Sequence, residues 1–272
     1  MTTAGTSTTS AGTLVIIGGG NMGAALAGGL LAAGVVDASS LSIVEVSADR
    51  RAVLESMFPG VSVVASVPAC VAAVIAVKPP DVPAATATAV AAGARRILSI
   101  AAGVTIRTLE SAAGSGVAVI RSMPNTPALV REGASAIAAG STANDDDMIW
   151  AEHVLGSVGL VVRVPEAQLD AVTGLAGSGP AYLFLVAESL MQAGVDAGLP
   201  ADVVDRLVRQ LLVGSAALLA QGEPPSDLRV KVTSPGGTTA AGLRVLDERE
   251  LRQAFIDAVA AATARSRELG AS

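Results

Sequence analysis

The stretch LVIIGGGNMGAALAGGLL, residues 14–31, joins a short apolar run, a glycine turn and an alanine- and leucine-rich segment. Residues 14–17 are typical of a buried strand, and the segment through Leu31 is typical of a helix. Between them, Gly18-Gly19-Gly20-Asn21-Met22-Gly23 satisfies G-x-G-x-x-G at the first strand-to-helix turn, which is where dinucleotide-binding domains carry this motif. The sequence therefore predicts an α/β protein that starts with a Rossmann-type dinucleotide-binding domain.

The residues of this turn have separate expected roles. Gly18 permits the tight turn, Gly20 lets the backbone approach a pyrophosphate, and Gly23 lets the helix pack on the strand. The backbone N–H groups at the helix start, in the run Gly19 to Met22, are expected to hold the phosphates. The alternative is a plain tight turn that binds no ligand.

Glu45 lies at the end of the second expected strand, 41–46, about 20 residues after the turn. A carboxylate at this position accepts a hydrogen bond from a ribose 2′-OH and repels a 2′-phosphate, which favours NADH. Arg50 and Arg51 follow closely and would reach a phosphate if the loop folded back. A solvated charge at a strand end is a third interpretation, so the sequence predicts NADPH or NADH.

Further apolar runs alternate with helix-like segments, the pattern of a parallel sheet covered by helices. Strands are expected at 61–64, 73–77, 97–100, 117–120, 135–138 and 160–164, with a helix around 148–155. Two loops leave carboxyl ends of strands, where ligands bind in open α/β sheets. We therefore expect the cofactor to contact Ala76, Val77, Lys78 and Pro79 in one loop, and Ala101 and Ala102 in the other. Lys78 either faces the phosphates or is a solvated charge.

The pattern changes near residue 170, where long helical segments replace the strands. Helices are expected over 181–197, 201–220 and 248–269. The first is apolar nearly all round, which implies burial on several sides, and a small helical domain achieves this more easily with a partner subunit. We therefore expect a disordered leader over 1–12, a dinucleotide-binding domain over 13–166, and an all-helical substrate and dimerisation domain over 167–272.

Composition excludes several classes of protein. The net charge is −6 and only 2% of residues are aromatic, so the basic, aromatic-rich surface of a nucleic-acid-binding protein is not expected. The most apolar run, Ala69 to Val77, is far shorter than the roughly 20 residues of a membrane span. The N-terminus lacks the features of a secretory signal. Cys70 is the only cysteine, which rules out an internal disulfide and a cysteine cluster for a metal. We expect a cytoplasmic protein without a metal site, in which His153 and Cys70 are structural.

Four segments together resemble the pyrroline-5-carboxylate reductase family: GGGNMG at 18–23, AVKP at 76–79, RSMPNTP at 121–127 and LAGSGPAY at 175–182. A fifth, VTSPGGTTAAGL at 232–243, is similar to the signature of that family almost letter for letter. The resemblance implies a nucleotide-binding domain followed by a helical dimerisation domain. It also implies reduction of 1-pyrroline-5-carboxylate to L-proline by NAD(P)H, the last step of proline biosynthesis, in a homodimer that assembles into a larger ring of dimers.

The signature segment is expected to form a turn over 234–237 and a helix from Thr238 to Leu246. Exposed N–H groups at that helix start would bind the substrate carboxylate. The expected substrate-binding residues are Ser234, Gly236, Gly237, Thr238 and Thr239, and the Thr239 hydroxyl would hydrogen-bond the ring nitrogen as it gains its hydrogen.

Without the resemblance, a Ser/Thr helix cap that binds no ligand is the favoured interpretation of this segment. The resemblance further implies that Asn125 and Glu166 border the substrate, although a turn cap and a surface charge are alternatives for them. A contact between Lys231 and the cofactor is left open.

Two other functions compete with this interpretation. Residues 174–179 fit the GxxGxG pattern of β-hydroxyacid dehydrogenases, but that family places a catalytic lysine four residues later, where this chain has Leu183. An apolar side chain cannot act as an acid or base toward an alcohol. A non-catalytic nucleotide-sensing protein would keep the glycine turn but would not need the intact SPGGTT loop.

Overall fold

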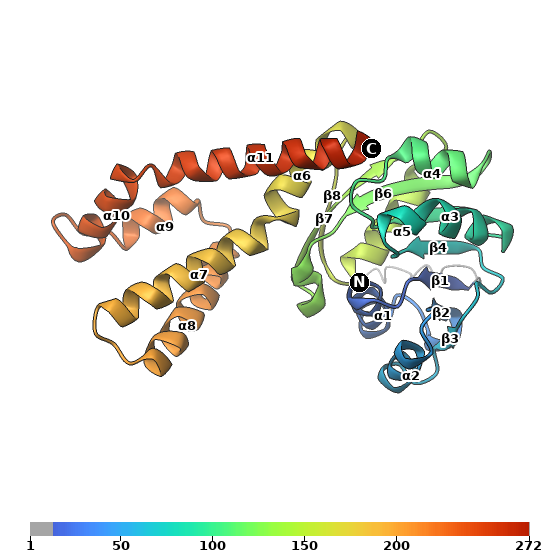
Figure 1. The fold of residues 1–272 in the computed structure, drawn as a ribbon, viewed down its shortest axis with the longest axis horizontal. Helices are drawn as coiled ribbons and strands as arrows, with labels where there is room; N and C mark the ends of the chain where they lie inside the picture. The colour runs from blue at the N-terminus through green and yellow to red at the C-terminus, as the bar shows by residue number, and fades with distance from the viewer. Residues whose placement is uncertain (1–12, 272) are drawn as a thin grey trace, which may run out of the picture. The chain divides into compact units, whose positions relative to one another are not determined.

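The computed structural model describes residues 13–271, so the leader predicted over residues 1–12 lies outside the described residues. The chain forms two compact units (Figure 1). Unit 1 runs up to Gly177 and includes the end of the chain from Ala262, and unit 2 comprises Ser178–Ala261. Each unit is described below by itself.

Unit 1 is built on an eight-stranded sheet in the order β3-β2-β1-β4-β5-β6-β7-β8. Neighbouring strands are parallel except for β6 and β7, which are antiparallel. The strands are β1 (Leu14–Ile17), β2 (Leu41–Val44), β3 (Ser62–Val64), β4 (Ala72–Ile75), β5 (Arg96–Ser99), β6 (Ala118–Met123), β7 (Gly133–Ala139) and β8 (Gly159–Arg163).

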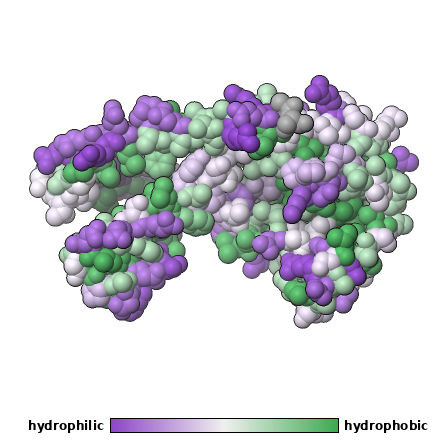
Figure 2. All heavy atoms as spheres, in the orientation of Figure 1, coloured by the Kyte–Doolittle hydropathy of each residue, from purple (hydrophilic) through white to green (hydrophobic). Residues whose placement is uncertain are grey.

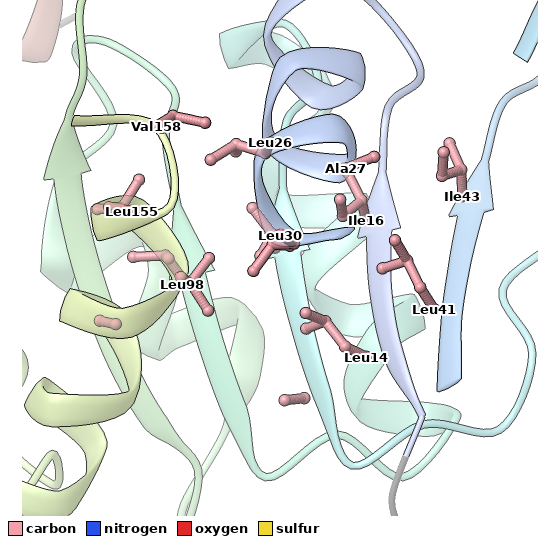
Figure 3. Close-up of a cluster of buried hydrophobic side chains, with 14 of the residues drawn as sticks. Leu14, Ile16, Leu26, Ala27, Leu30, Leu41, Ile43, Leu98, Leu155 and Val158 are labelled. Atoms are coloured by element: carbon pink, nitrogen blue, oxygen red, sulfur yellow. The ribbon is translucent and has the colours of Figure 1, made fainter. Parts of the chain in front are cut away.

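Successive residues of the central strands pack against helices on opposite faces of the sheet, because side chains alternate along a strand. Ile16 of β1 joins a core with α1 (Asn21–Ala32) and α5 (Asp145–Gly156), in which Leu26 and Leu30 are fully buried (Figure 3). Val15 joins a second core with α3 (Val82–Ala91) and α4 (Ile106–Ala113). The remaining long helix of this unit, α2 (Ala48–Met57), packs beside β3. The sheet is therefore buried on both faces, as expected for a doubly wound fold.

All eight strands expected from the sequence are present, and the α/β fold class is confirmed. The differences lie at the ends: β2 ends at Val44, two residues early, and β6 continues to Met123. Because β2 and β4 lie on either side of β1, the chain reverses its direction of strand addition there. In open α/β sheets the carboxyl edge at such a reversal is where a dinucleotide binds.

The segment between the last strand and unit 2 packs with unit 1. It forms η4 (Glu166–Gln168), α6 (Leu169–Val172) and a π-helix, η5 (Thr173–Gly177). Leu169 and Val172 pack in a small core with β7, and the Ser266 hydroxyl donates to Asp170 at 2.7 Å. The compact units therefore divide after Gly177, whereas the functional boundary inferred from the sequence follows Glu166.

Unit 2 is helical, with α7 (Gly179–Asp196), α8 (Ala201–Leu219), α9 (Pro225–Lys231) and α10 (Thr238–Glu248). The helix expected over 248–269 was placed wrongly at its start, because α10 continues to Glu248 and α11 (Leu251–Ala271) begins three residues later. Glu250 between them adopts a left-handed backbone with φ 54°. The second half of α11, from Ala262, belongs to unit 1.

Unit 2 buries little apolar surface in the single chain. Within residues 178–261, all of which the structure describes, the buried hydrophobic residues are Val204 and Val208. On α7, Phe184 and Leu185 are exposed by 64% and 62%, and Figure 2 shows hydrophobic side chains among the charged ones over α7 and α8. By length and composition alone, the helical stretch Glu166–Asp196 would be able to cross a membrane. One such stretch is weak evidence, since apolar helices that pack against protein meet the same criterion.

Candidate active site

The glycine turn has the shape that a dinucleotide requires. Gly18 has φ 111°, and a Cβ on it would lie 2.4 Å from the carbonyl oxygen of Ala76, so only glycine fits there. A Cβ on Gly20 would meet no atom within 4 Å, which leaves open space beside the start of α1. Gly20 is also the N-cap of α1 and offers no side chain to its first N–H groups. Open space beside free helix N–H groups fits the pyrophosphate of NAD(P)H.

Hydrogen bonds connect the residues that follow β2 to this turn. The Glu45 carboxylate accepts hydrogen bonds from the N–H groups of Gly19, at 3.2 Å, and Ser47, at 2.9 Å. Arg50 Nε donates to the Gly19 carbonyl at 2.7 Å, and Arg51 Nη1 donates to the Glu45 carbonyl at 2.9 Å. The structure therefore places Glu45 and Arg50 beside the turn, whereas Arg51 contacts the carbonyls of Glu45 and Val46 after β2.

The two other loops expected to line the cofactor leave neighbouring strands. Because β1, β4 and β5 are parallel, their carboxyl ends share one edge of the sheet. The backbone N–H of Ala76 donates to Ile17 at 2.8 Å, which sets the first loop beside the glycine turn. Val77 is half-buried, while Lys78 and Pro79 are exposed. In the second loop Ala101 is buried and Ala102 is exposed. Three loops thus meet along the edge where the sequence predicted the cofactor.

Asn125 and Glu166 both lie in unit 1, where they make specific contacts. Asn125 Nδ2 donates to the Ala176 carbonyl at 3.0 Å, and its Oδ1 accepts from the Ala134 N–H at 2.8 Å. Glu166 Oε1 accepts from Arg121 Nη1 at 2.9 Å and from the Ile106 N–H at 2.7 Å. Asn125 follows β6, so it stands at the same sheet edge as the cofactor loops.

Arg121 is a functional candidate that the sequence reasoning missed. Its side chain is 7% exposed on β6, and it forms ion pairs with Glu166 and, at 3.9 Å, with Asp170. A signal for it was present, because the run VAVIR at 117–121 places a charge inside an otherwise apolar strand. A charge in such a strand is buried only when it is paired.

The signature segment forms the predicted turn and helix in unit 2. The Gly237 N–H donates to the Ser234 carbonyl at 3.0 Å, Gly236 has φ 70°, and α10 begins at Thr238. The N-cap is Gly237, with no side-chain hydrogen bond to the helix start. Neither threonine is therefore the N-cap, and Thr239 is half-buried in the first turn. Lys231, whose role was left open, pairs with Glu223 at 2.6 Å.

The remaining reactive side chains lie elsewhere. His153 is exposed on α5. Cys70 is buried, and this burial raises the pKa of its thiol, which disfavours the reactive thiolate. Within residues 13–271 no three His, Cys, Asp or Glu side chains are grouped in a way that could hold a metal ion.

Known proteins match both halves of the chain. Residues 166–269 match the family model described as pyrroline-5-carboxylate reductase dimerisation, and residues 13–103 match the model described as NADP oxidoreductase coenzyme F420-dependent. A pyrroline-5-carboxylate reductase of Synechocystis sp. is 40% identical over 94% of this chain and 98% of its own length.

Solved structures agree with these matches. A pyrroline-5-carboxylate reductase from Coxiella burnetii superposes with a TM-score of 0.89 at 33% identity, covering 95% of this chain and 98% of the other. Plasmodium falciparum pyrroline carboxylate reductase with NADP bound gives a TM-score of 0.82 at 30% identity and the same coverage. With these identities over nearly its full length, the chain belongs to the pyrroline-5-carboxylate reductase family.

Proposed function

We propose that this chain reduces 1-pyrroline-5-carboxylate to L-proline with a hydride from NAD(P)H, the last step of proline biosynthesis. The observation that carries the proposal is the identity to pyrroline-5-carboxylate reductases over 94% of the chain. Two local features support it independently. The glycine turn leaves open space beside free N–H groups, and α10 starts at a glycine N-cap that follows the signature turn.

Reduction of an imine requires little acid–base chemistry from the protein. A protonated imine is already electrophilic, and the nicotinamide supplies the hydride when it is bound. The side chains of the site therefore need only bind, align the two reacting carbons and exclude water. This requirement is consistent with the surroundings of His153, which is exposed on α5, and of Cys70, which is buried in the core of unit 1.

Unit 1 supplies the proposed cofactor site. The N–H groups from Gly20 to Met22 hold the pyrophosphate at the start of α1, since the Gly19 N–H already donates to the Glu45 carboxylate. Glu45, held beside the turn by Gly19 and Ser47, faces the adenosine ribose. The loops at Ala76–Pro79 and Ala101–Ala102 flank the cofactor along the carboxyl edge of the sheet.

Unit 2 supplies the proposed groups that bind the substrate. N–H groups at the start of α10 bind the carboxylate, together with the turn residues Ser234, Gly236, Gly237 and Thr238. The Thr239 hydroxyl hydrogen-bonds the ring nitrogen as the nitrogen gains its hydrogen. The N-cap position is occupied by Gly237, so Thr239, in the first turn of α10, is not the N-cap residue. In unit 1, Asn125 and Glu166 border the substrate.

We assign residues 13–166 to cofactor binding and 167–272 to substrate binding and dimerisation, in a homodimer that assembles into a ring of dimers in the cytoplasm. The exposed apolar side chains of α7 and α8 support the dimer, because a monomer rarely exposes so many of them together. They also account for the apolar stretch Glu166–Asp196 without a membrane.

A coupled assay tests the proposed activity. Purified protein should oxidise NADPH or NADH when 1-pyrroline-5-carboxylate is added, and chromatography should detect one proline for each cofactor oxidised. Thr239→Val is the matched control, which should bind NADPH with unchanged affinity but form little proline. A protein that binds NADPH tightly but forms no proline would contradict the proposed function.

A further inference from the structure

Three alternate residues of β6 and the loop after it, Arg121, Met123 and Asn125, point to one face of the sheet. Side chains alternate along a strand, and Asn125 is still extended, with φ −127° and ψ 169°. Each of the three contacts the segment 166–177, which joins the last strand to unit 2. We call these three residues the β6 rail.

Arg121 makes the charged contacts of the rail. Its guanidinium pairs with Glu166 at 2.9 Å and with Asp170 at 3.9 Å, and Asp170 also accepts from the buried Ser266 hydroxyl at 2.7 Å. Buried charges of this kind are stable only with their partners in place. Arg121 therefore fixes the start of the segment and, through Asp170, the end of α11.

Met123 and Asn125 hold the other end of the segment. A Cβ on Gly177 would lie 2.6 Å from Met123 Cε, so the methionine packs directly on the glycine backbone. Asn125 uses its amide twice, accepting from the Ala134 N–H at the start of β7 and donating to the Ala176 carbonyl. One side chain thus ties the sheet to the last turn of η5.

The element held by the rail is a π-helix, Thr173–Gly177. Single π-turns are rare and occur frequently at functional sites. This one lies beside the carboxyl end of β6, which is parallel to β5 and shares the edge of the cofactor loops. With Glu45 at the carboxyl end of β2, on the proposed adenosine side of β1, a bound cofactor would direct its nicotinamide half toward β5 and β6, on the other side of β1.

We propose that Arg121, Met123 and Asn125 are positioning residues that hold the π-helix as one wall of the substrate pocket. The inference rests on the proposed function and assigns Asn125 an indirect part in it. Asn125 acts on the substrate by fixing residues 176 and 177, and its amide is not itself the ligand. The rail sets the place of the substrate relative to the nicotinamide and leaves the pyrophosphate site unchanged.

Asn125→Asp tests the rail with little change in volume. The carboxylate still accepts from Ala134 but no longer donates to Ala176, where two oxygens now face each other. We expect kcat/KM for 1-pyrroline-5-carboxylate to fall by about tenfold to a hundredfold, since a lost and unsatisfied hydrogen bond has this effect. The Kd of NADPH, measured by fluorescence, should stay within about twofold. Amide hydrogen exchange without substrate should accelerate in residues 173–177.

A pair of arginine variants provides the matched control. Arg121→Met should lower kcat/KM and accelerate exchange across 166–177. Arg96→Met removes a comparable ion pair, with Asp147 at 2.5 Å, from the amino end of β5. It should lower Tm while leaving kcat/KM per folded molecule and the exchange of 166–177 unchanged.

Either of two results with Asn125→Asp would overturn the proposal. A normal kcat/KM would show that the rail does not position the substrate. A reduced kcat/KM without faster exchange at 173–177 would make Asn125 a direct ligand of the substrate. If the unmodified protein formed no proline, the proposed function would fail separately, and the exchange data would still decide whether Asn125 holds the π-helix.

Discussion

The two units of this chain differ in how many of their apolar side chains are buried. In unit 1, Ile16, Leu26, Leu98 and Ile120 are fully buried between the sheet and its helices. In unit 2, Val204 and Val208 are the only buried hydrophobic residues of 178–261. Unit 1 therefore contains its own core, whereas unit 2 presents a large exposed apolar surface in the single chain.

The arrangement of α8 shows where that surface lies. Leu207, Leu211 and Leu218 are each more than half exposed, and Gly214 lies between the last two. Their spacing of four, three and four residues forms one stripe along the helix. An apolar stripe on a surface helix is stabilised by burial, and residues 166–269 match a family model described as a dimerisation domain, so we propose that a second copy covers it.

The largest expected effect comes from charging this stripe with Leu211→Asp. By symmetry the dimer loses two leucines, at about 1.5–3 kcal/mol each, and buries two carboxylates at several kcal/mol each. The dimer Kd should rise at least about a thousandfold, and sedimentation velocity should show monomers. Ala216→Asp adds the same charge on the opposite side of α8 and should leave the dimer intact. A stable and fully active monomer would show that unit 2 does not need a partner.

The next largest effect concerns the chemical role proposed for Thr239 in unit 2. Thr239→Val keeps the side-chain shape but removes the hydroxyl proposed to bond the ring nitrogen. One such hydrogen bond contributes about 2.7–4 kcal/mol, so kcat should fall roughly a hundredfold to a thousandfold. The Kd of NADPH should not change, because the proposed cofactor site belongs to unit 1.

Thr239→Ser is the matched control and should retain much of the activity. Thermal stability measured on both variants checks the alternative structural role. A normal kcat in Thr239→Val, with a loss of stability alone, would leave the backbone N–H groups of the signature turn as the proposed substrate ligands.

The two units also differ in how well their elements could be predicted from the sequence. In unit 1 the strands were found because apolar runs and glycine turns are local signals, and the order of the motifs placed three loops at one edge. In unit 2 the break between α10 and α11 was expected, between helices over 238–246 and 248–269, but it was placed too early, because Glu250 adopts φ 54° without a glycine or proline to indicate it. The helix boundary is set there by tertiary structure.

The contacts of the site were less predictable than its location. Glu45 was placed at the right strand end, but its hydrogen bonds to Gly19 and Ser47 depend on how two loops fold together. Arg121 was overlooked because its partners, Glu166 and Asp170, are more than 40 residues away in sequence. A spacing rule cannot reveal a pairing that only the fold creates. The proposed ligands of the substrate stay predictions for the same reason.

A smaller effect is expected at the adenosine end of unit 1. NADH should serve at least as well as NADPH, because the Glu45 carboxylate repels a 2′-phosphate. Glu45→Gln should shift the ratio of kcat/KM toward NADPH by about five- to thirtyfold, on the order of 1–2 kcal/mol for one charge pair near a protein surface. Asp49→Asn, an equal change of charge on exposed α2, should leave the ratio unchanged. A strong NADPH preference that survives Glu45→Gln would show that this carboxylate does not face the ribose.

The smallest expected effect compares a helical glycine in each unit. Glycine inside a helix costs about 0.5–1 kcal/mol relative to alanine. A Cβ on Gly28 of α1 would lie 3.5 Å from Phe58, an ordinary contact, so Gly28→Ala should raise Tm by about 1–4 °C. A Cβ on Gly214 of α8 meets nothing within 4 Å in the single chain. If the leucine stripe of α8 were exposed to solvent, Gly214→Ala would therefore raise Tm by the same amount.

We expect Gly214→Ala to gain less than Gly28→Ala or to lower Tm, because Gly214 lies in the leucine stripe that we propose as the dimer contact, where an added methyl group would keep a partner helix from approaching the backbone. Calorimetry at two protein concentrations separates the causes. A loss caused by a weaker dimer grows as the protein is diluted, since dimer stability depends on concentration, while the gain at Gly28 does not depend on it. Equal gains at both positions and both concentrations would mean that the face of α8 around Gly214 is open to solvent, and the interface would then have to lie elsewhere on unit 2.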